Sequence, residues 1–363
     1  MSLSKSSLLS LLDTPLQEVG VGAHNIKAAK KLGYVRIPGV INLSYSRRQT
    51  LHSCPRKFLQ REIIESAPID HNTIHTAFGS SWGAGLQELF LTGSIERATI
   101  AILANWSVST EEFDGKSGKS LWTCVDGIHH FYKHHFPRIS EEYEVAIYNG
   151  KPCIELFFYI RMGQQFSYQG HIDLIMRHKR TGALVVWEFK TSGYEQHEAN
   201  WANSEQTLGY SLIVDMIAEH SSDYRVHYLI FNPKHRDSYE ENFGVVEYEF
   251  GKSQNSKAEF ITDLGLDIQL VQTYLKVGLF PKRGGACRSF NRTCEFFGTC
   301  DLEIKQLHDV HQTSAGLYES MTLEDVDFLI DIGDVIAKQK SVDKGQDFVT
   351  MIPEVAQSDQ AVY

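Results

Sequence analysis

The chain has 363 residues, of which 42% are hydrophobic, so it can bury one large core or two modest ones. Its longest apolar runs, GALVVWEF and LIVDMIA, are shorter than the roughly 20 residues of a membrane-spanning helix, and its start lacks the cleavage pattern of a secretory signal. The formal charge of −10 argues against general attraction to nucleic acid. We therefore expect a cytoplasmic protein with reduced thiols, in which clustered cysteines favour metal over disulfides.

The first 140 residues are predicted to be mainly helical. Residues 1–40 give weak signals, and helical periodicity then predicts helices over 46–64, 77–91 and 121–136. The first of these contains a strongly basic stretch, RRQTLHSCPRKFLQR, which includes Cys54. This local positive charge stands out in an acidic chain.

The composition changes at Tyr143. β-branched and aromatic residues predict four strands in two hairpins, with turns at Asn149-Gly150 and Thr181-Gly182. A helix over 203–220, a strand over 224–233 and a helix over 261–278 follow, and the weakly patterned chain after about Lys338 is expected to be mobile. The predicted organisation is a helical portion (1–140), an α/β portion (141–302) and a C-terminal helix with a tail (303–363).

The second hairpin gathers polar side chains near one end. Side chains two apart share a face of a strand, which puts His171 with Asp173 and Glu188 with Lys190. Pairing across the turn brings Asp173 close to Glu188. Two carboxylates suit Mg²⁺ or Mn²⁺, and the charge of Lys190 could orient a water or steady a pentacovalent phosphate. Phosphodiester hydrolysis requires this combination.

Plainer explanations exist for each of these residues. An E-x-K triplet is common by chance, and charges at a strand end are usually solvated. Glu188 and Lys190, however, end a very apolar strand, where an unpaired charge is costly unless it lies at a functional edge. Gln206 and Tyr210 are four apart on a predicted helix and share a face, which could also be simple packing on the sheet.

Together, G-x-x-D ending at Asp173, E-x-K from Glu188 to Lys190 and Q-x-x-x-Y from Gln206 to Tyr210 resemble the PD-(D/E)xK nuclease superfamily, and more narrowly its RecB-like branch. The resemblance implies an α/β fold, with a restriction-endonuclease-like core whose mixed central sheet is flanked by helices. It also implies a metal-dependent deoxyribonuclease. Asp173 and Glu188 would hold the metal, Lys190 would position or activate the attacking water, and Gln206 and Tyr210 would support substrate placement.

The same branch includes nucleases that carry an iron-sulfur cluster, such as AddB-type subunits, CRISPR-adaptation exonucleases and exonuclease V. One cysteine precedes their nuclease motifs and three follow, which here implies Cys54, Cys287, Cys294 and Cys300 as ligands of a [4Fe-4S] cluster. The C-terminal spacing is C-x6-C-x5-C, whereas many relatives have C-x2-C-x5-C. Such a cluster would close a loop around the whole core. Zn²⁺ is the alternative, because four thiolates suit either.

One feature of the branch is missing. Many RecB-like nucleases complete the metal site with a histidine in a phrase like F-G-x-x-x-H, and this chain has Gly83 at that place. The possible substitutes are His171, Gln87 and water, with His75 as a weaker candidate. His171 could equally be simple strand surface.

A cluster joining Cys54 to the C-terminal cysteines would also bring basic residues together. This surface would suit the phosphate backbone of DNA, although scattered solvated charges are the ordinary alternative. Its members would be Arg47, Arg48, Arg56, Lys57, Arg61, Lys282, Arg283, Arg288 and Arg292. Cys124 and Cys153 lie in apolar contexts and are expected to be ordinary buried thiols.

The resulting expectation is a DNA exonuclease acting on single-stranded ends, in replication, recombination or repair, in a bacterial or phage-infected cell. One alternative is an inactive DNA-binding or assembly module that keeps the fold, with Gly83 as the sign of decay. Another is a zinc-stapled endonuclease. The sequence does not determine the polarity of the exonuclease, its preference for single or double strands, its choice between DNA and RNA, or its oligomeric state.

Overall fold

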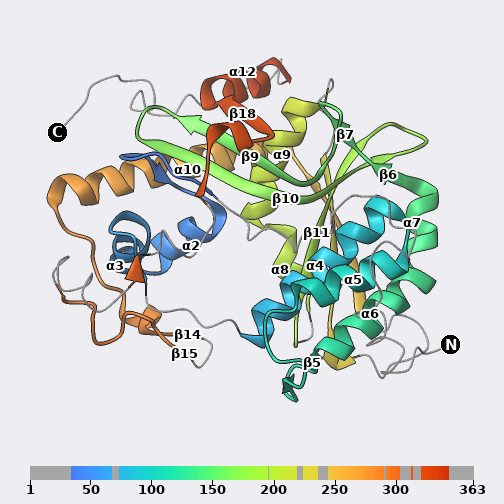
Figure 1. Cartoon of the computed structure of the whole chain (residues 1–363). Coiled ribbons are helices and arrows are strands. Elements are labelled where there is room, and N and C mark those ends of the chain that lie inside the picture. The colour runs from blue at the N-terminus through green and yellow to red at the C-terminus, as the bar shows by residue number, and fades with distance from the viewer. Residues whose placement is uncertain are drawn as a thin grey trace.

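The computed structural model describes residues 34–67, 73–194, 196–218, 224–235, 244–289, 292–302, 312–313 and 320–342. An eight-stranded mixed sheet runs through the middle of the molecule, with helices on both of its faces (Figure 1). The strand order is β13-β12-β11-β10-β9-β18, and β2 and β6 also pair with β10. The strands are β2 (Ile41–Asn42), β6 (Tyr143–Val145), β9 (Ile154–Met162), β10 (Phe166–His178), β11 (Leu184–Thr191), β12 (Tyr224–Phe231), β13 (Val245–Lys252) and β18 (Phe328–Asp331). The predicted α/β class is confirmed.

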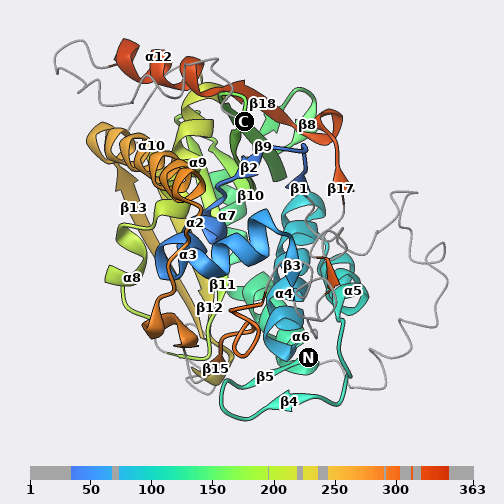
Figure 2. The ribbon, with the colours of Figure 1, turned by 90° about the vertical axis from the view of Figure 1, so that its left-hand side faces the viewer.

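The sheet separates two hydrophobic cores. Side chains alternate along β11, so that Val186 belongs to one core and Trp187 to the other. The first core is covered by α9 (Glu205–Ile217), α10 (Gln254–Val277) and α12 (Ile332–Val342). The second is covered by α4 (Ile74–Thr92), α5 (Ile95–Asn105) and α6 (Leu121–His134). Figure 2 shows α9 and α10 on one side of the molecule and α4, α5 and α6 on the other.

The predicted helix over 46–64 is broken at Cys54. Its backbone is extended, with φ −158° and ψ 101°, and Pro55 follows as the first residue of α3 (Pro55–Phe58). A residue before proline is pushed out of the helical region, whereas proline is tolerated in the first turn of a helix. The stretch therefore forms α2 (Tyr45–Ser53), α3 and a π-helix (Leu59–Ile63), with Cys54 at the first break.

Helix α4 has well-defined ends. The side chain of Thr73 accepts a hydrogen bond from the backbone N–H of Thr76, and the hydroxyl of Thr76 accepts one from the backbone N–H of Thr73. The helix ends at Gly93, whose left-handed φ of 69° closes the last turn. These caps define the ends of α4, which packs against β11 and carries Gly83 and Gln87.

Helix α9 connects the parallel strands β11 and β12 and lies unusually close to the sheet. A Cβ atom on Gly209 would come within 2.2 Å of the hydroxyl oxygen of Tyr168, so the close packing requires a glycine. This contact sets the height of α9 above the sheet. It thereby brings Gln206 and Tyr210 over the end of β11.

The C-terminal part of the chain contributes to the same sheet. Strand β18 pairs in parallel with β9, and the amide of Gln339 in α12 donates to the buried Asp215 of α9 at 2.7 Å. The sheet therefore takes strands from each of the three portions expected from the sequence. Residues 1–33 and 343–363, which include most of the expected tail, lie outside the described residues.

In the part of the chain that the structure describes, every helix is too short or too polar to cross a lipid bilayer.

Candidate active site

The site forms where β10 and β11 separate. Their antiparallel ladder ends with Leu174 opposite Trp187. One residue further on, the Oδ2 atom of Asp173 accepts a hydrogen bond from the backbone N–H of Phe189 at 2.8 Å. A carboxylate thus takes the place of a ladder carbonyl. Asp173 and Glu188 face each other at this point, as the position of the hairpin turn predicts.

A line of hydrogen bonds runs from Glu188 across to α9. The ammonium group of Lys190 donates to Oε1 of Glu188 and, at 3.1 Å, to the amide oxygen of Gln206. The amide nitrogen of Gln206 then donates to the hydroxyl of Tyr210 at 2.7 Å. The structure therefore brings together four of the residues that the sequence motifs single out.

A third carboxylate, Glu155, joins Asp173 and Glu188. Its Oε1 atom accepts a hydrogen bond from the amide nitrogen of Gln87, which reaches in from α4. Glu155 lies near the start of β9 with a left-handed φ of 49°, which is uncommon for a residue other than glycine. The sequence analysis does not identify Glu155, and no motif in the sequence marks it.

Burial, followed by the crowding of negative charge, raises the pKa values of two carboxylates in the site. The pKa of Asp173 lies well above its ordinary range, because of burial and then because of the charges of Glu188 and Glu155. Burial likewise raises the pKa of Glu155 to about 7. Glu188 is completely buried, and its Oε2 atom, like that of Glu155, has no hydrogen-bond partner among the described residues. Buried carboxylate oxygens without partners fit a hard divalent cation with oxygen ligands.

The comparison with protein families agrees with this geometry. A model of the PD-(D/E)XK nuclease superfamily matches residues 42–301. The chain belongs to this superfamily. The match includes the five motif residues of the site, Asp173, Glu188, Lys190, Gln206 and Tyr210. Comparison with curated protein sequences gave no match.

His171 points away from the PD-(D/E)XK carboxylates, which corrects the expectation that it shares a strand face with Asp173. Its ring stacks on Phe157 at 4.4 Å between centroids. Burial lowers its pKa to about 4, and the carboxylate that opposes this shift is Asp327. The reason is a break in strand alternation, since Ile172 and Leu174 belong to opposite cores although they are two residues apart.

Gly83 lies on α4 one turn before Gln87. A Cβ atom placed on Gly83 would have the Gln87 amide nitrogen as its nearest neighbour, at 3.9 Å. In this member of the superfamily, α4 therefore reaches the site through Gln87, whose amide donates to Glu155. His75, the weaker candidate from the sequence, lies 3.7 Å from a carboxylate oxygen of Asp114, outside this group.

Tyr45, the first residue of α2, lies at the edge of the site. Burial raises its pKa, and among the charges that act on it are those of Lys190, Glu205 and Glu188. The side chain is only partly buried. Tyr45 is a second site residue that the sequence analysis does not identify.

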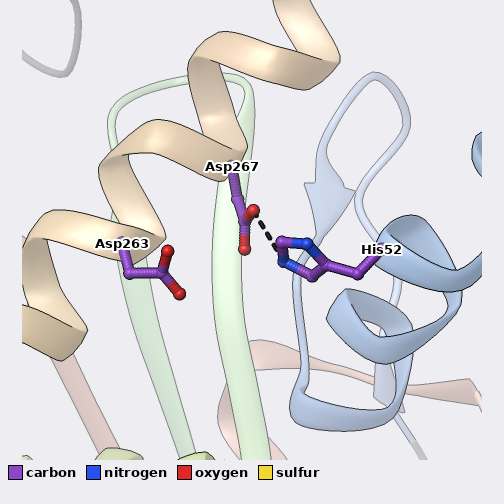
Figure 3. A group of neighbouring side chains, drawn as sticks. All are labelled: His52, Asp263 and Asp267. Carbon is purple, nitrogen blue, oxygen red and sulfur yellow. Dashed lines mark ion pairs between the residues drawn. The ribbon is translucent and has the colours of Figure 1, made fainter.

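A different group of potential metal ligands lies between α2 and α10 (Figure 3). Ligand atoms of His52, Asp263 and Asp267 lie within 4.8 Å of one another. The fully buried Arg48, however, donates from Nε to Asp267 at 2.5 Å and also donates to Asp263, with Glu205 3.3 Å away. Because the guanidinium of Arg48 already contacts all three carboxylates, the group is an ion-pair network that links α2 to α9 and α10.

The chain closure expected around the cysteines is present in the backbone. The amide of Gln60 donates to the carbonyl of Cys300 at 3.2 Å, and the N–H of Arg56 donates to the carbonyl of Pro281 at 3.2 Å. Burial raises the pKa of the Cys300 thiol, and Cys54 is close enough to contribute. Segments more than 220 residues apart in the sequence are therefore in contact.

The four cysteines differ in exposure and spacing. Cys54 is buried, Cys294 and Cys300 are partly buried, and Cys287 is exposed. Among the residues that the structure describes, no three of these sulfur atoms lie within 4.8 Å of one another. Cys124 and Cys153 are buried, as expected.

Among the described residues, five of the nine basic residues expected at this surface pair with acidic side chains. Arg48 is buried in its network, and the side chain of Arg56 donates to the carbonyl of Phe280. Arg283 and Arg288 are exposed, and the side chain of Arg292 lies outside the described residues. The remaining ion pairs join Arg47 to Glu62, Lys57 and Arg61 to Glu295, and Lys282 to Asp301. The sequence overestimates this surface because it cannot show these acidic partners.

Proposed function

We propose that the chain is a divalent-metal-dependent deoxyribonuclease of the RecB-like kind that removes nucleotides from single-stranded DNA ends. The observation that carries the proposal is the hydrogen-bonded line from Glu188 through Lys190 to Gln206, with Asp173 beside Glu188. It combines a buried carboxylate oxygen of Glu188 that has no partner among the described residues with a positive charge held in place by hydrogen bonds. The order of the RecB-like motifs supports the choice of substrate and of a role in replication, recombination or repair.

The carboxylates supply the metal-binding part of the chemistry. Asp173 and Glu188 would hold the ion, which when bound would polarise the scissile phosphate and lower the pKa of a water ligand. The hydrogen bond from Phe189 N–H fixes one oxygen of Asp173, so the other is oriented in advance. Burial between protein layers keeps both carboxylates in a medium where their attraction for a cation is strong.

Lys190 supplies a positive charge at a fixed position. Burial lowers its pKa, but the carboxylates outweigh this effect, Glu188 first, so the pKa lies above the ordinary value and the ammonium stays charged at neutral pH. A charged ammonium donates hydrogen bonds and cannot accept a proton. We therefore assign Lys190 to orienting the attacking water and steadying the phosphate, which favours the positioning role over that of a base.

Gln206 and Tyr210 would place the substrate. Burial holds the pKa of Tyr210 well above its ordinary range, so the phenol stays neutral. Its oxygen accepts from Gln206, which leaves its O–H free to donate toward a phosphate oxygen. Tyr45, at the edge of the same site, offers an aromatic face on which a nucleotide base could stack.

We further propose that a [4Fe-4S] cluster is bound by Cys54, Cys287, Cys294 and Cys300. It would link the segment before the nuclease motifs to the segment after them. The contact between the Cys54 segment and residues 280–300 supports the pairing of Cys54 with the C-terminal cysteines. Anaerobic purification followed by iron and zinc analysis tests it. A colourless protein with stoichiometric zinc would exclude the cluster.

Cleavage of end-labelled DNA with Mg²⁺ or Mn²⁺ tests the activity. Linear single strands should be degraded, EDTA should stop the reaction, and circular single strands should survive if the enzyme needs an end. Glu188→Gln and Lys190→Met should abolish cleavage, whereas Glu249→Gln, on exposed β13, should not. The nuclease proposal fails if the wild type cleaves no DNA, or if the two site variants cleave normally.

A further inference from the structure

Resting on the proposed function, the structure assigns Glu155 as a third carboxylate ligand of the divalent ion and Gln87 as the residue that positions it. Neither residue belongs to the motifs read from the sequence. Leu156 pairs with Ile172 in the β9–β10 ladder, so Glu155 lies beside Asp173 at the next step.

The two oxygens of Glu155 have different environments. Oε1 accepts from the Gln87 amide, whereas Oε2 is buried and has no partner among the described residues. Glu188 has the same arrangement, with Oε1 on Lys190 and Oε2 without a partner. A buried carboxylate oxygen without a donor is costly. Two such oxygens in one group fit a divalent cation that both would bind.

The charge balance leads to the same conclusion. Glu155, Asp173 and Glu188 form one electrostatically interacting group, and Lys190 is the cation that acts on Asp173 within it. A hydrogen-bonding role for Glu155 within the fold would need one oxygen and no charge, which a glutamine would supply at lower cost. A carboxylate in this place is useful if a divalent ion balances the excess negative charge.

The backbone of Glu155 also departs from ordinary strand geometry. Its φ of 49° lies in the left-handed region, which is unfavourable for a residue other than glycine. The strand changes faces at this residue, because Ile154 packs against one core and Leu156, two positions later, belongs to the other. Backbone strain of this kind persists where the surrounding structure enforces it, as at binding sites.

Gln87 holds Glu155 from the opposite side. An amide nitrogen donates to a carboxylate, so Gln87 fixes Oε1 and leaves Oε2 directed elsewhere. Gln87 belongs to the well-capped α4, so its side chain starts from a rigid support. Because it contacts the ligand and not the ion, Gln87 is a positioning residue.

Mn²⁺ binding to the full chain tests the assignment without depending on cleavage. Isothermal titration and the EPR signal of free Mn²⁺ would be compared for wild type, Glu155→Gln, Gln87→Met and the control Glu144→Gln, an exposed carboxylate on β6. We expect Glu155→Gln to weaken Mn²⁺ binding at least about tenfold, Gln87→Met to weaken it less, and Glu144→Gln to leave it unchanged. Unchanged affinity in Glu155→Gln overturns the assignment.

Thermal melting separates ligation from a structural role. In EDTA, Glu155→Gln should melt at or above the wild-type temperature, because it removes a buried charge, and the stabilisation by Mn²⁺ should shrink. A large fall of the melting temperature in EDTA would make Glu155 a structural residue and overturn the assignment. A wild type that binds Mn²⁺ through Glu155 but cleaves no DNA would leave the assignment standing and refute only the nuclease proposal.

Discussion

The Asp173 carboxylate accepts the backbone N–H of Phe189, at the point where β10 and β11 stop pairing. This bond explains how an acidic side chain lies inside the sheet without disrupting it, since it satisfies a backbone donor that has lost its ladder partner. The structural role of Asp173 therefore requires a hydrogen-bond acceptor at this position but no negative charge.

Asp173→Asn tests this distinction between hydrogen bonding and charge. The asparagine oxygen can still accept from Phe189, so we expect the fold to be kept and the melting temperature in EDTA to stay level or rise. DNA cleavage should fall at least about 100-fold, because a metal ligand has lost its charge. Melting curves and cleavage rates measured on one preparation check both parts. A variant that unfolds would show that the charge itself supports the fold.

The pH dependence of stability should report on His171. Its pKa in the folded protein is lowered to about 4, chiefly by burial. The unfolded chain therefore takes up this proton near pH 6.5, before the folded protein does, and stability is lost as the pH falls from about 6.5 to about 4. The variant His171→Phe keeps a ring against Phe157 but has no group that titrates at residue 171. Its stability should therefore not fall for this reason. As the pH falls across this range, the melting temperature of His171→Phe should decrease less than that of the wild type.

The same variant tests the role of His171 in metal binding. Because its ring stacks on Phe157, away from the carboxylates, His171→Phe should bind Mn²⁺ with wild-type affinity. A marked loss of affinity would mean that the ring turns toward Asp173 when the ion is bound.

Arg48→Met should destabilise the protein strongly. It leaves Asp267 buried without its main partner, and breaking a buried pair in this way costs about 3–5 kcal/mol. Urea denaturation measures the loss. The matched control is Arg225→Ala, which breaks an exposed pair with Glu249 and should cost less than about 1 kcal/mol. Similar losses for the two variants would contradict the network assigned to Arg48.

Tyr210→Phe should affect catalysis and leave metal binding unchanged. The phenol oxygen accepts from Gln206 and lies two hydrogen bonds away from Lys190. Losing one such bond should lower kcat/KM about fivefold to tenfold, with the Mn²⁺ affinity unaltered. A parallel loss of Mn²⁺ affinity would place Tyr210 nearer to the ion than its hydrogen bonds indicate.

Gly83→His offers a gain-of-function test in the Glu155→Gln background. A Cβ atom at residue 83 would have the Gln87 amide nitrogen, at 3.9 Å, as its nearest side-chain neighbour, so a side chain can begin there without a clash at its Cβ atom. We expect it to recover part of the lost Mn²⁺ affinity. No recovery, with the fold intact by circular dichroism, would show that α4 lies too far from the ion for direct ligation.

The sequence predicts the part of the site that depends on short-range patterns. The turn at Thr181-Gly182 sets the pairing of β10 with β11, which brings Asp173 and Glu188 together. Helical spacing likewise puts Gln206 and Tyr210 on one face. These relationships need only the period of a strand or a helix.

The remaining parts depend on departures from regular geometry and on long-range partners. The expected position of His171 is wrong because alternation breaks after Ile172, and Glu155 goes unnoticed because its backbone conformation cannot be read from its neighbours. Strand β13, VVEYEFGK, is also unpredicted, since its polar residues are those of a sheet edge. The burial of Arg48 depends on carboxylates more than 200 residues away.

The place of β18 in the sheet has a consequence for the timing of folding. Strand β9 carries Glu155, and its neighbours are β10 on one side and β18, residues 328–331, on the other. Asp327 also accepts the N–H of Phe157 in β9, at 3.0 Å. During synthesis at about 5–20 residues per second, β9 waits many seconds for this second neighbour. We therefore expect the carboxylates to reach their final arrangement only after residues 328–331 have been synthesised and have left the ribosome.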